Sequence, residues 1–177
     1  MSSSPVRVTV LISGNGSNLQ AVIDKTSAGQ LPTKIVRVIS NRKDAFGLER
    51  ARRADIPTVY HNLLKYKKQQ PATPEGVQAA REEYDAELAR LVLQDAPDLV
   101  VCLGFMHVVS AKFLVPLEAA KLKIINLHPA LPGAFNGVVS FLFSRGAIIM
   151  HTALLISPCK CTECHRTCPC CMAGGQD

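Results

Sequence analysis

The sequence has no tryptophan, few aromatic residues of any kind (5%) and only one cysteine, Cys102, in its first 158 residues. Its most apolar late stretch, 137–157, is interrupted by Arg145 and His151, which argues against a membrane span. The polar start and the short apolar run 8–12 lack the pattern of a secretory signal. We therefore expect a soluble, cytoplasmic protein with no membrane partner.

The charge balance is positive but dilute. The 177 residues include 20 Lys and Arg against 14 Asp and Glu, a formal charge of +6. The basic residues are scattered, and an enzyme that handles anionic metabolites would have the same excess, so we expect no nucleic-acid partner. With 47% hydrophobic residues, the chain can bury a sizeable core, which excludes disorder for most of its length.

Short β-branched runs alternate with helix-like segments. The runs predict buried strands at 8–12, 35–39, 58–60, 99–103 and 123–127. The segments between them predict helices at 18–28, 44–54, 75–94 and 111–120. This alternation predicts an α/β fold of the Rossmann type, with a doubly wound, mostly parallel sheet and right-handed crossovers.

The longest predicted helix is amphipathic. Its apolar residues recur at helical spacing from Val77 to Val92, so the charged residues between them are expected to point away from the core. Those charged residues are Arg81, Glu82, Asp85 and Arg90. Residues 65–76, which include two glutamines and two prolines, predict a flexible insertion before this helix.

Residues 13–18 (SGNGSN) follow the first predicted strand and open the first helix. The glycines allow a tight turn close to an anion, and Ser17 and Asn18 add donors at a positive helix terminus. The alternative is a plain turn with a Ser or Asn cap. A dinucleotide site is less favoured, because Leu19 replaces the third glycine of that fingerprint and residues 40–42 (SNR) lack an acid for a ribose. The pattern favours a phosphate held by backbone amides.

Residues 103–109 leave the fourth predicted strand and are apolar where a loop is expected to be solvated. A flat apolar ligand lying against this loop would explain the pattern. A buried loop under the next helix would explain it equally well. His107, taken alone, is more typical of a satisfied surface histidine than of a catalyst.

Residues 124–133 (IINLHPALPG) leave the fifth predicted strand. Asn126 and His128 are two residues apart, so in a strand they point to the same face. An amide beside an imidazole can polarise a carbonyl while the histidine moves a proton. The alternative is a core histidine bonded to the backbone. Ligands in this fold class bind beyond the carboxyl ends of the strands, which favours the catalytic interpretation.

Four motifs, in this order, resemble the phosphoribosylglycinamide formyltransferase family of folate-dependent enzymes. They are 13–21 (SGNGSNLQA), 40–51 (SNRKDAFGLERA), 104–106 (GFM) and 126–133 (NLHPALPG). The resemblance covers about residues 6–137, and residues 131–133 (LPG) resemble fungal members more than bacterial ones. It implies transfer of a formyl group from 10-formyltetrahydrofolate to the amine of 5-phosphoribosylglycinamide in de novo purine (IMP) biosynthesis.

The resemblance also implies roles for single residues, with no metal among the ligands. The substrate phosphate and ribose would be bound by Gly16, Ser17 and Asn18. The folate pteridine pocket would be lined by Met106, His107, Val108 and Val109. Arg81 would meet 10-formyltetrahydrofolate just before the long helix. Asn126 would hold the formyl oxygen and His128 would donate a proton. The family commonly has arginine at the position of His107, so that side chain's contact is not carried over.

Six of the seven cysteines fall between Cys159 and Cys171, which divides the chain into a domain at 1–137 and an anomalous cysteine-rich tail at 138–177. The resemblance implies further strands after the fifth, and an aspartate that raises the pKa of the catalytic histidine. Neither is recognisable after Gly137, so we expect the sheet to be incomplete at its C-terminal end and the transfer to be impaired.

Three interpretations of the tail remain open. It is intron-derived or frame-shifted sequence, a real truncated isoform, or a metal module. The module would use Cys161, Cys164, Cys168 and Cys171, although the three residues between the two pairs leave little room for a supporting hairpin.

Two other functions also remain open. A formyltetrahydrofolate hydrolase would share the Asn and His pair, and an inactive scaffold would bind metal through the cysteine tail. The oligomeric state is not predicted.

Overall fold

Five parallel strands form one sheet in the computed structural model, which describes residues 4–127 of the chain. The strands are β1 (Val6–Ile12), β2 (Thr33–Ser40), β3 (Thr58–Tyr60), β4 (Leu99–Leu103) and β5 (Lys123–Leu127). Their order across the sheet is β3-β2-β1-β4-β5. Every neighbouring pair is parallel. The α/β class expected from the sequence is confirmed, and the last three strands have the predicted bounds.

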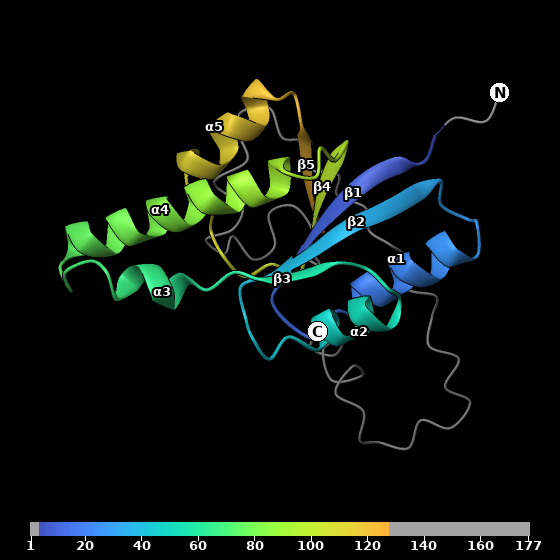
Figure 1. Ribbon diagram of the computed structural model, residues 1–177, viewed down its shortest axis with the longest axis horizontal. Coiled ribbons are helices and arrows are strands. Elements are labelled where there is room, and N and C mark those ends of the chain that lie inside the picture. Colours follow the sequence, from blue (N-terminus) through green and yellow to red (C-terminus); the bar gives the residue numbers. More distant parts are fainter. Residues whose placement is uncertain (1–3, 128–177) are drawn as a thin grey trace, which may run out of the picture.

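The helices cover both faces of this sheet. They are α1 (Ser17–Ser27), α2 (Phe46–Arg53), α3 (Leu63–Lys67), α4 (Pro74–Leu93) and α5 (Ala111–Ala119). The chain winds from β1 outward to β3, returns to β4 and winds outward again on the other side. Right-handed crossovers in opposite directions place their helices on opposite faces. Accordingly, α1 and α2 lie on one face, and α4 and α5 on the other (Figure 1).

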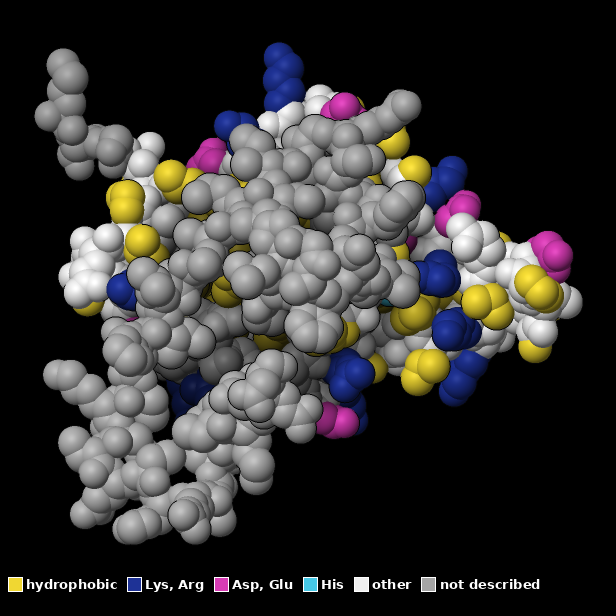
Figure 2. All heavy atoms as spheres, turned by 180° about the vertical axis from the view of Figure 1, so that it is seen from behind, with side chains coloured by type: hydrophobic (Ala, Val, Ile, Leu, Met, Phe, Trp, Pro, Cys, Tyr) yellow, Lys and Arg dark blue, Asp and Glu magenta, His cyan; other side chains and the backbone are white. Residues whose placement is uncertain are grey.

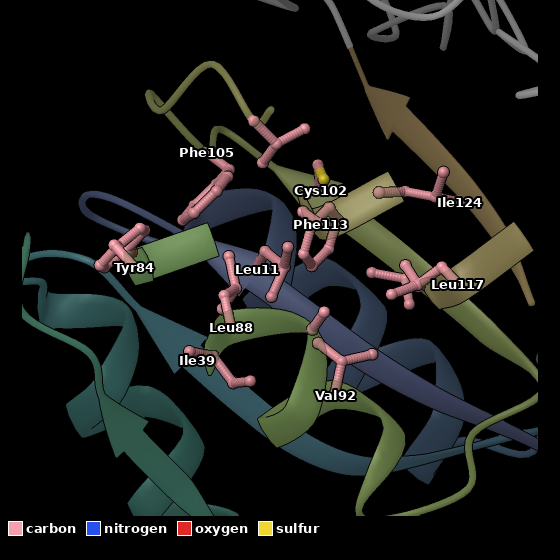
Figure 3. Close-up of a cluster of buried hydrophobic side chains, with 13 residues drawn as sticks. Leu11, Ile39, Tyr84, Leu88, Val92, Cys102, Phe105, Phe113, Leu117 and Ile124 are labelled. Carbon is pink, nitrogen blue, oxygen red and sulfur yellow. The ribbon is translucent and has the colours of Figure 1, made fainter. Parts of the chain in front are cut away.

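Alternation along the buried strands divides the core into two clusters. In β1, Val10 and Ile12 pack with α1 and α2, whereas Leu11 between them packs with α4 and α5. Figure 3 shows the second cluster, in which Leu11 of β1 lies among side chains of α4, α5 and the neighbouring strands. Both faces of β1 are therefore shielded from solvent from Val8 to Ile12, which explains why this run is almost entirely apolar.

The sequence prediction for α4 assigned two residues to the wrong side. Asp85 is fully buried rather than turned to solvent, and Val77 is 41% exposed rather than packed. In Figure 1 the N-terminal turns of α4, the helix that begins at Pro74, extend past the sheet on the side of α3. Asp85 lies one to two turns before Leu88 and Val92, on the same buried face.

Half of the expected insertion at 65–76 belongs to helices, because α3 includes 65–67 and α4 includes 74–76. Helix α3 occupies its first residues, with Asn62 Oδ1 accepting a hydrogen bond from the Leu64 N–H (2.8 Å). Thr73 caps α4 by accepting from the Gly76 N–H (3.1 Å), and Pro74 occupies the first turn. A five-residue helix has too few apolar positions to show a period in the sequence, which is why α3 was missed.

The surface of the described residues is mixed in character. None of their helices has the length and apolarity needed to cross a membrane. On the face seen in Figure 2, Lys and Arg side chains are interspersed with acidic and hydrophobic ones. Residues 4–127 contain no group of three or more His, Cys, Asp or Glu side chains placed to hold a metal ion. The four tail cysteines considered as metal ligands lie outside the described residues.

Truncation of Leu88 in α4 tests the packing between helix and sheet. Leu88→Ala should lower the free energy of unfolding by about 2–5 kcal/mol, because it leaves a cavity at a fully buried site. Val77→Ala in the same helix should change it by no more than about 0.5 kcal/mol. Urea denaturation followed by circular dichroism measures both, and equal losses would contradict the packing described.

Candidate active site

The loops that follow β1 and β4 meet at the point where the strand order reverses. Here the Met106 N–H donates to Ser13 Oγ over 2.7 Å, and Ser13 is buried. Crevices for ligands in open parallel sheets form at this position, beyond the carboxyl ends of the strands. The hydrogen bond therefore joins the two loops that the sequence marked as phosphate-binding and folate-binding.

A close backbone approach fixes the turn between β1 and α1. Gly16 has a φ of 71°, and a Cβ there would lie 2.6 Å from Gly47 Cα at the start of α2. The Gly47 N–H donates to Gly14 O over 3.1 Å. Only glycine fits such a contact without moving the backbone. The motif at 13–18 is thus a rigid corner packed on α2.

Carbonyl groups of this corner are turned toward α2. Arg50 Nε donates to Asn15 O over 2.9 Å, and the Arg50 guanidinium also lies over the Phe46 ring. The N-cap of α1 is Gly16, and no side chain of the described residues caps the first turn. This turn contains Ser17 and Asn18, and the amides at a helix N-terminus without a side-chain cap suit an anion. The alternative of a Ser or Asn cap is therefore wrong.

The loop between β4 and α5 is partly buried and partly exposed, so each of the two interpretations of its sequence holds for some of its residues. Phe105 and Val109 are buried in the core, as a loop packed under a helix requires. Met106 between them is 73% exposed. The loop is therefore fixed by its buried side chains and exposes one apolar side chain, at the edge of the sheet where a ligand would lie.

Asp85 anchors this loop from α4. Its Oδ2 accepts from the Ser110 N–H over 2.6 Å, and its Oδ1 accepts from His107 Nε2 over 2.7 Å. Ser110 is also the N-cap of α5, where a negative charge is favourable. The His107 side chain is only 7% exposed, so its interpretation as a surface histidine is wrong. Asp85 was missed, although its spacing from Leu88 and Val92 is a signal of burial.

Aromatic rings surround this carboxylate. Tyr84 stacks on His61, with ring centroids 4.1 Å apart, and meets His107 edge-on at 4.9 Å. His61 Nε2 donates to Tyr84 O over 2.9 Å. Burial lowers the pKa of His61 and raises the pKa of the Tyr84 hydroxyl. Both groups are therefore held in their neutral forms near pH 7.

Arg81 reaches the same loop, but not from the position expected. It lies inside α4 rather than just before it, because the helix begins at Pro74. Its Nη2 donates to Val108 O over 3.3 Å. The structure thus brings Arg81 of α4 into contact with Val108, which belongs to the loop that the resemblance assigned to folate binding.

Asn126 lies next to the last residue of β5, half-buried and in register with Cys102 of β4. Its position at the carboxyl end of the strand is as predicted. His128 lies outside the described residues, so the geometry of the pair stays a prediction.

A cavity of about 660 Å³ opens beside these loops. Its walls come from 13–15 after β1, from 41–46 after β2 and from 62–64 after β3, with Tyr60, Tyr84 and His107 completing it. Of the site residues predicted from the sequence, His107 alone among the described ones lines this cavity. The cavity is therefore adjacent to the predicted site rather than the same place.

A family model described as formyl transferase matches residues 6–144. The chain belongs to the formyl transferase family. The match includes Gly16–Asn18, the loop at 104–109 and residues 126–133. It extends seven residues past the boundary expected at 137.

Relatives in this family share its sequence and fold. The phosphoribosylglycinamide formyltransferase of Schizosaccharomyces pombe is 50% identical, over 84% of this chain and 72% of the relative. The enzyme of that name from Escherichia coli is 39% identical, over 75% of this chain and 56% of the relative. A crystal structure of glycinamide ribonucleotide transformylase 1 from Symbiobacterium toebii matches with a TM-score of 0.62 and 35% identity, over 77% of this chain and 57% of that one.

These comparisons confirm the family expected from the motifs. The Saccharomyces cerevisiae relative is 45% identical, so both yeast proteins are more similar to this chain than the E. coli protein is. This agrees with the fungal character of the motif at 131–133. The chain spans 62% of the S. cerevisiae relative and 57% of the solved S. toebii chain.

Substitution of three glycines, Gly14 and Gly16 in the corner and Gly29 after α1, distinguishes the cost of backbone strain from the cost of steric contact. Gly16→Ala should lower the free energy of unfolding by about 2–4 kcal/mol, because it combines a positive φ with a clash at Gly47. Gly29→Ala, with positive φ but open space, should cost about 1 kcal/mol. Gly14→Ala, with neither, should stay within about 0.5 kcal/mol. Chemical denaturation of the three variants tests this order, and equal values for Gly16 and Gly14 would refute the close approach.

His61 should make stability depend on pH. Because burial lowers its pKa below the ordinary value, the unfolded chain takes up a proton at higher pH than the folded chain does. The free energy of unfolding should therefore fall as the pH drops from about 7 through the folded pKa of His61. In His61→Gln the fall between pH 7.5 and pH 5.5 should be smaller than in the wild type. Urea titrations at both pH values measure it, and an unchanged fall would exclude His61 as the source.

Proposed function

We propose that this chain transfers the formyl group of 10-formyltetrahydrofolate to the amine of 5-phosphoribosylglycinamide, a step of purine biosynthesis. The observation that carries the proposal is the 50% identity to the S. pombe enzyme of that name across 84% of this chain. The positions of the motifs support it, because three of the four lie in loops at the carboxyl edge of one sheet and the fourth begins at the end of β5.

The uncapped first turn of α1 suits the phosphate of the substrate. Gly16, Ser17 and Asn18 would supply backbone amides and two polar side chains, at a helix end that carries partial positive charge. The contact between Gly16 and Gly47 would hold these donors in place before the substrate binds. A preformed cradle of this kind lowers the entropy cost of binding.

The loop at 106–109 suits the flat pteridine of the formyl donor. Met106 is exposed, while Asp85, Ser13 and Arg81 bind the loop from below and from the side. His107 Nε2 is already used by Asp85, so that nitrogen is not free for the folate. His107 would therefore act by orienting the loop, and Met106 and Val108 would form the apolar surface. Val109, expected to line the pocket, is instead packed in the core beneath it.

The reaction is acyl transfer. The substrate amine attacks the formyl carbon, a C–N bond forms, and the carbonyl electron pair moves to oxygen. Asn126 would donate a hydrogen bond to that oxygen as its charge develops. The carbonyl would then re-form as the C–N bond to tetrahydrofolate breaks, and His128 would provide the proton that the leaving nitrogen needs. The attacking amine loses one proton and the leaving nitrogen gains one, so the reaction as a whole neither consumes nor releases a proton.

Four sequence-based expectations stay predictions. They are the cytoplasmic location, the boundary at 137, the absence of a metal and the impaired rate. Assay of this chain beside the S. pombe relative would test the last of these.

Asn126 provides the mutational test of the proposed transfer. With the full chain, formylated product should form only when both substrates are present. Asn126→Ala should lower kcat/KM by about 10²–10³-fold, since it removes a donor to the developing oxyanion. Gln69→Ala, at an exposed site outside the predicted site, is the matched control and should keep the wild-type value.

Product is measured by mass spectrometry and formate by enzymatic assay. If formate is released at the same rate with and without 5-phosphoribosylglycinamide, the chain is a hydrolase and the transferase proposal is wrong. If protein with an unchanged circular dichroism spectrum forms neither formylated product nor formate, both the transferase and the hydrolase are excluded.

A further inference from the structure

Arg50 of α2 bonds to the corner at 13–18 on both sides of the α1 N-terminus. Its Nε donates to Asn15 O over 2.9 Å, and its Nη1 donates to Gln20 Oε1 over 3.2 Å. Asn15 precedes the N-cap Gly16, and Gln20 lies one turn into the helix, where its N–H donates to Gly16 O. The first turn of α1 therefore lies between two acceptors that are held by one guanidinium.

The rest of the Arg50 side chain is also fixed. A Cβ at Gly16 would lie 3.6 Å from Arg50 Cδ, which places the aliphatic stem beside the turn. The guanidinium lies over the Phe46 ring, 4.8 Å from its centroid, and the two residues are four apart in α2. A planar guanidinium held on its face and along its edge loses little further freedom when its neighbours bind a ligand.

The positive charge of Arg50 is not neutralised by a carboxylate. Its acceptors are the amide oxygens of Asn15 and Gln20, and no acidic side chain in the part of the chain that the structure describes lies within ion-pair distance of it. Arg53 on the same helix, in contrast, pairs with Glu49 over 3.0 Å. A positive charge beside a helix N-terminus adds to the partial charge of the helix and favours an anion there.

Gln20 is oriented from its other end. Its Nε2 donates to Asp24 Oδ1 over 2.8 Å, one turn further along α1, so its Oε1 faces Arg50. The carboxylate of this network is therefore separated from the guanidinium by an amide, and it lies more than a turn from the first amides of the helix.

We propose that Arg50 is a positioning residue for the phosphate of the substrate, a role that rests on the proposed function. Its Nε and both Nη atoms already donate to Asn15 or Gln20, so it acts through the corner and not by touching the phosphate. The bond to Asn15 O keeps that carbonyl facing α2, while the amides of Ser17 and Asn18 face the anion. A carbonyl oxygen turned toward a phosphate would repel it, so fixing this one favours binding.

Steady-state kinetics of the full chain separates positioning from a general structural role. Arg50→Gln should raise the KM for 5-phosphoribosylglycinamide about tenfold, because the charge and the paired donors beside the phosphate are both lost. The KM for 10-formyltetrahydrofolate and kcat should each change less than about twofold, because no hydrogen bond of Arg50 goes to the loop after β4. A rise in both KM values, or a loss of kcat alone, would overturn the proposal.

Calorimetric titration with 5-phosphoribosylglycinamide measures the same effect without turnover. Arg50→Gln should weaken binding about tenfold. Arg50→Lys keeps the charge, but one ammonium cannot reproduce the planar donors to Asn15 and Gln20, so binding should stay about threefold weaker or more. Full recovery with lysine would overturn a role through the corner.

Gln20→Ala tests the coupling between the two helices. Alone it should weaken binding about two- to threefold, because the guanidinium loses one acceptor. In the Arg50→Gln background it should have no further effect, since the bond is already absent. Strictly additive losses would contradict an action of Arg50 through Gln20.

Arg53→Gln is the matched control. Arg53 lies on the same helix and over the same Phe46 ring, 5.7 Å from its centroid, but its hydrogen bond goes to Glu49 and not to the corner. Removing its charge should change affinity less than about twofold.

The outcomes for the positioning role and for the transfer differ. Binding that weakens in both Arg50 variants and not in Arg53→Gln supports the positioning role, and if no formylated product forms, only the transfer is removed. Product formed by Arg50→Gln at an unchanged KM keeps the transfer and overturns the positioning role. No binding of 5-phosphoribosylglycinamide to the wild type at concentrations on the order of 5 mM also overturns it.

Discussion

The buried carboxylate of Asp85 is the interaction on which the rest of the site depends. A charge without solvent is stable only when donors surround it, and here the Ser110 N–H and His107 Nε2 supply them. The same two bonds connect α4 to the loop after β4 and to the start of α5. Removing the carboxylate would break both connections at once. The position of Met106 and Val108 therefore depends on a side chain buried in the core.

A second constraint acts from the opposite face of the sheet. The contact between Gly16 and Gly47 packs the first corner onto α2, and Ser13 bonds to the Met106 N–H across the switch point. Loops supported by different helices are thus fixed relative to each other. Acyl transfer needs this, because the reacting amine and formyl carbon must be held within a few tenths of an ångström of their productive positions.

Prediction from the sequence succeeded where a local pattern repeats. The strands and the four longer helices have periods or capping residues that a single segment displays, as in the Thr73 and Pro74 start of α4. It failed where a partner far along the chain decides the outcome. Arg81 and His107 have unremarkable neighbours, and their hydrogen bonds go to Val108 O and Asp85, 27 and 22 positions away.

The sequence by itself determined the α/β class, the family and the corner with its glycines, because each depends on residue type at short spacing. Only the tertiary structure decided which charged residue of α4 is buried, since burial of Asp85 follows from donors that folding brings to it. The cavity beside the loop 41–46 was likewise invisible in the sequence. Its lining joins Tyr84 to residues from three strand ends, and only the parallel sheet places those ends at one edge.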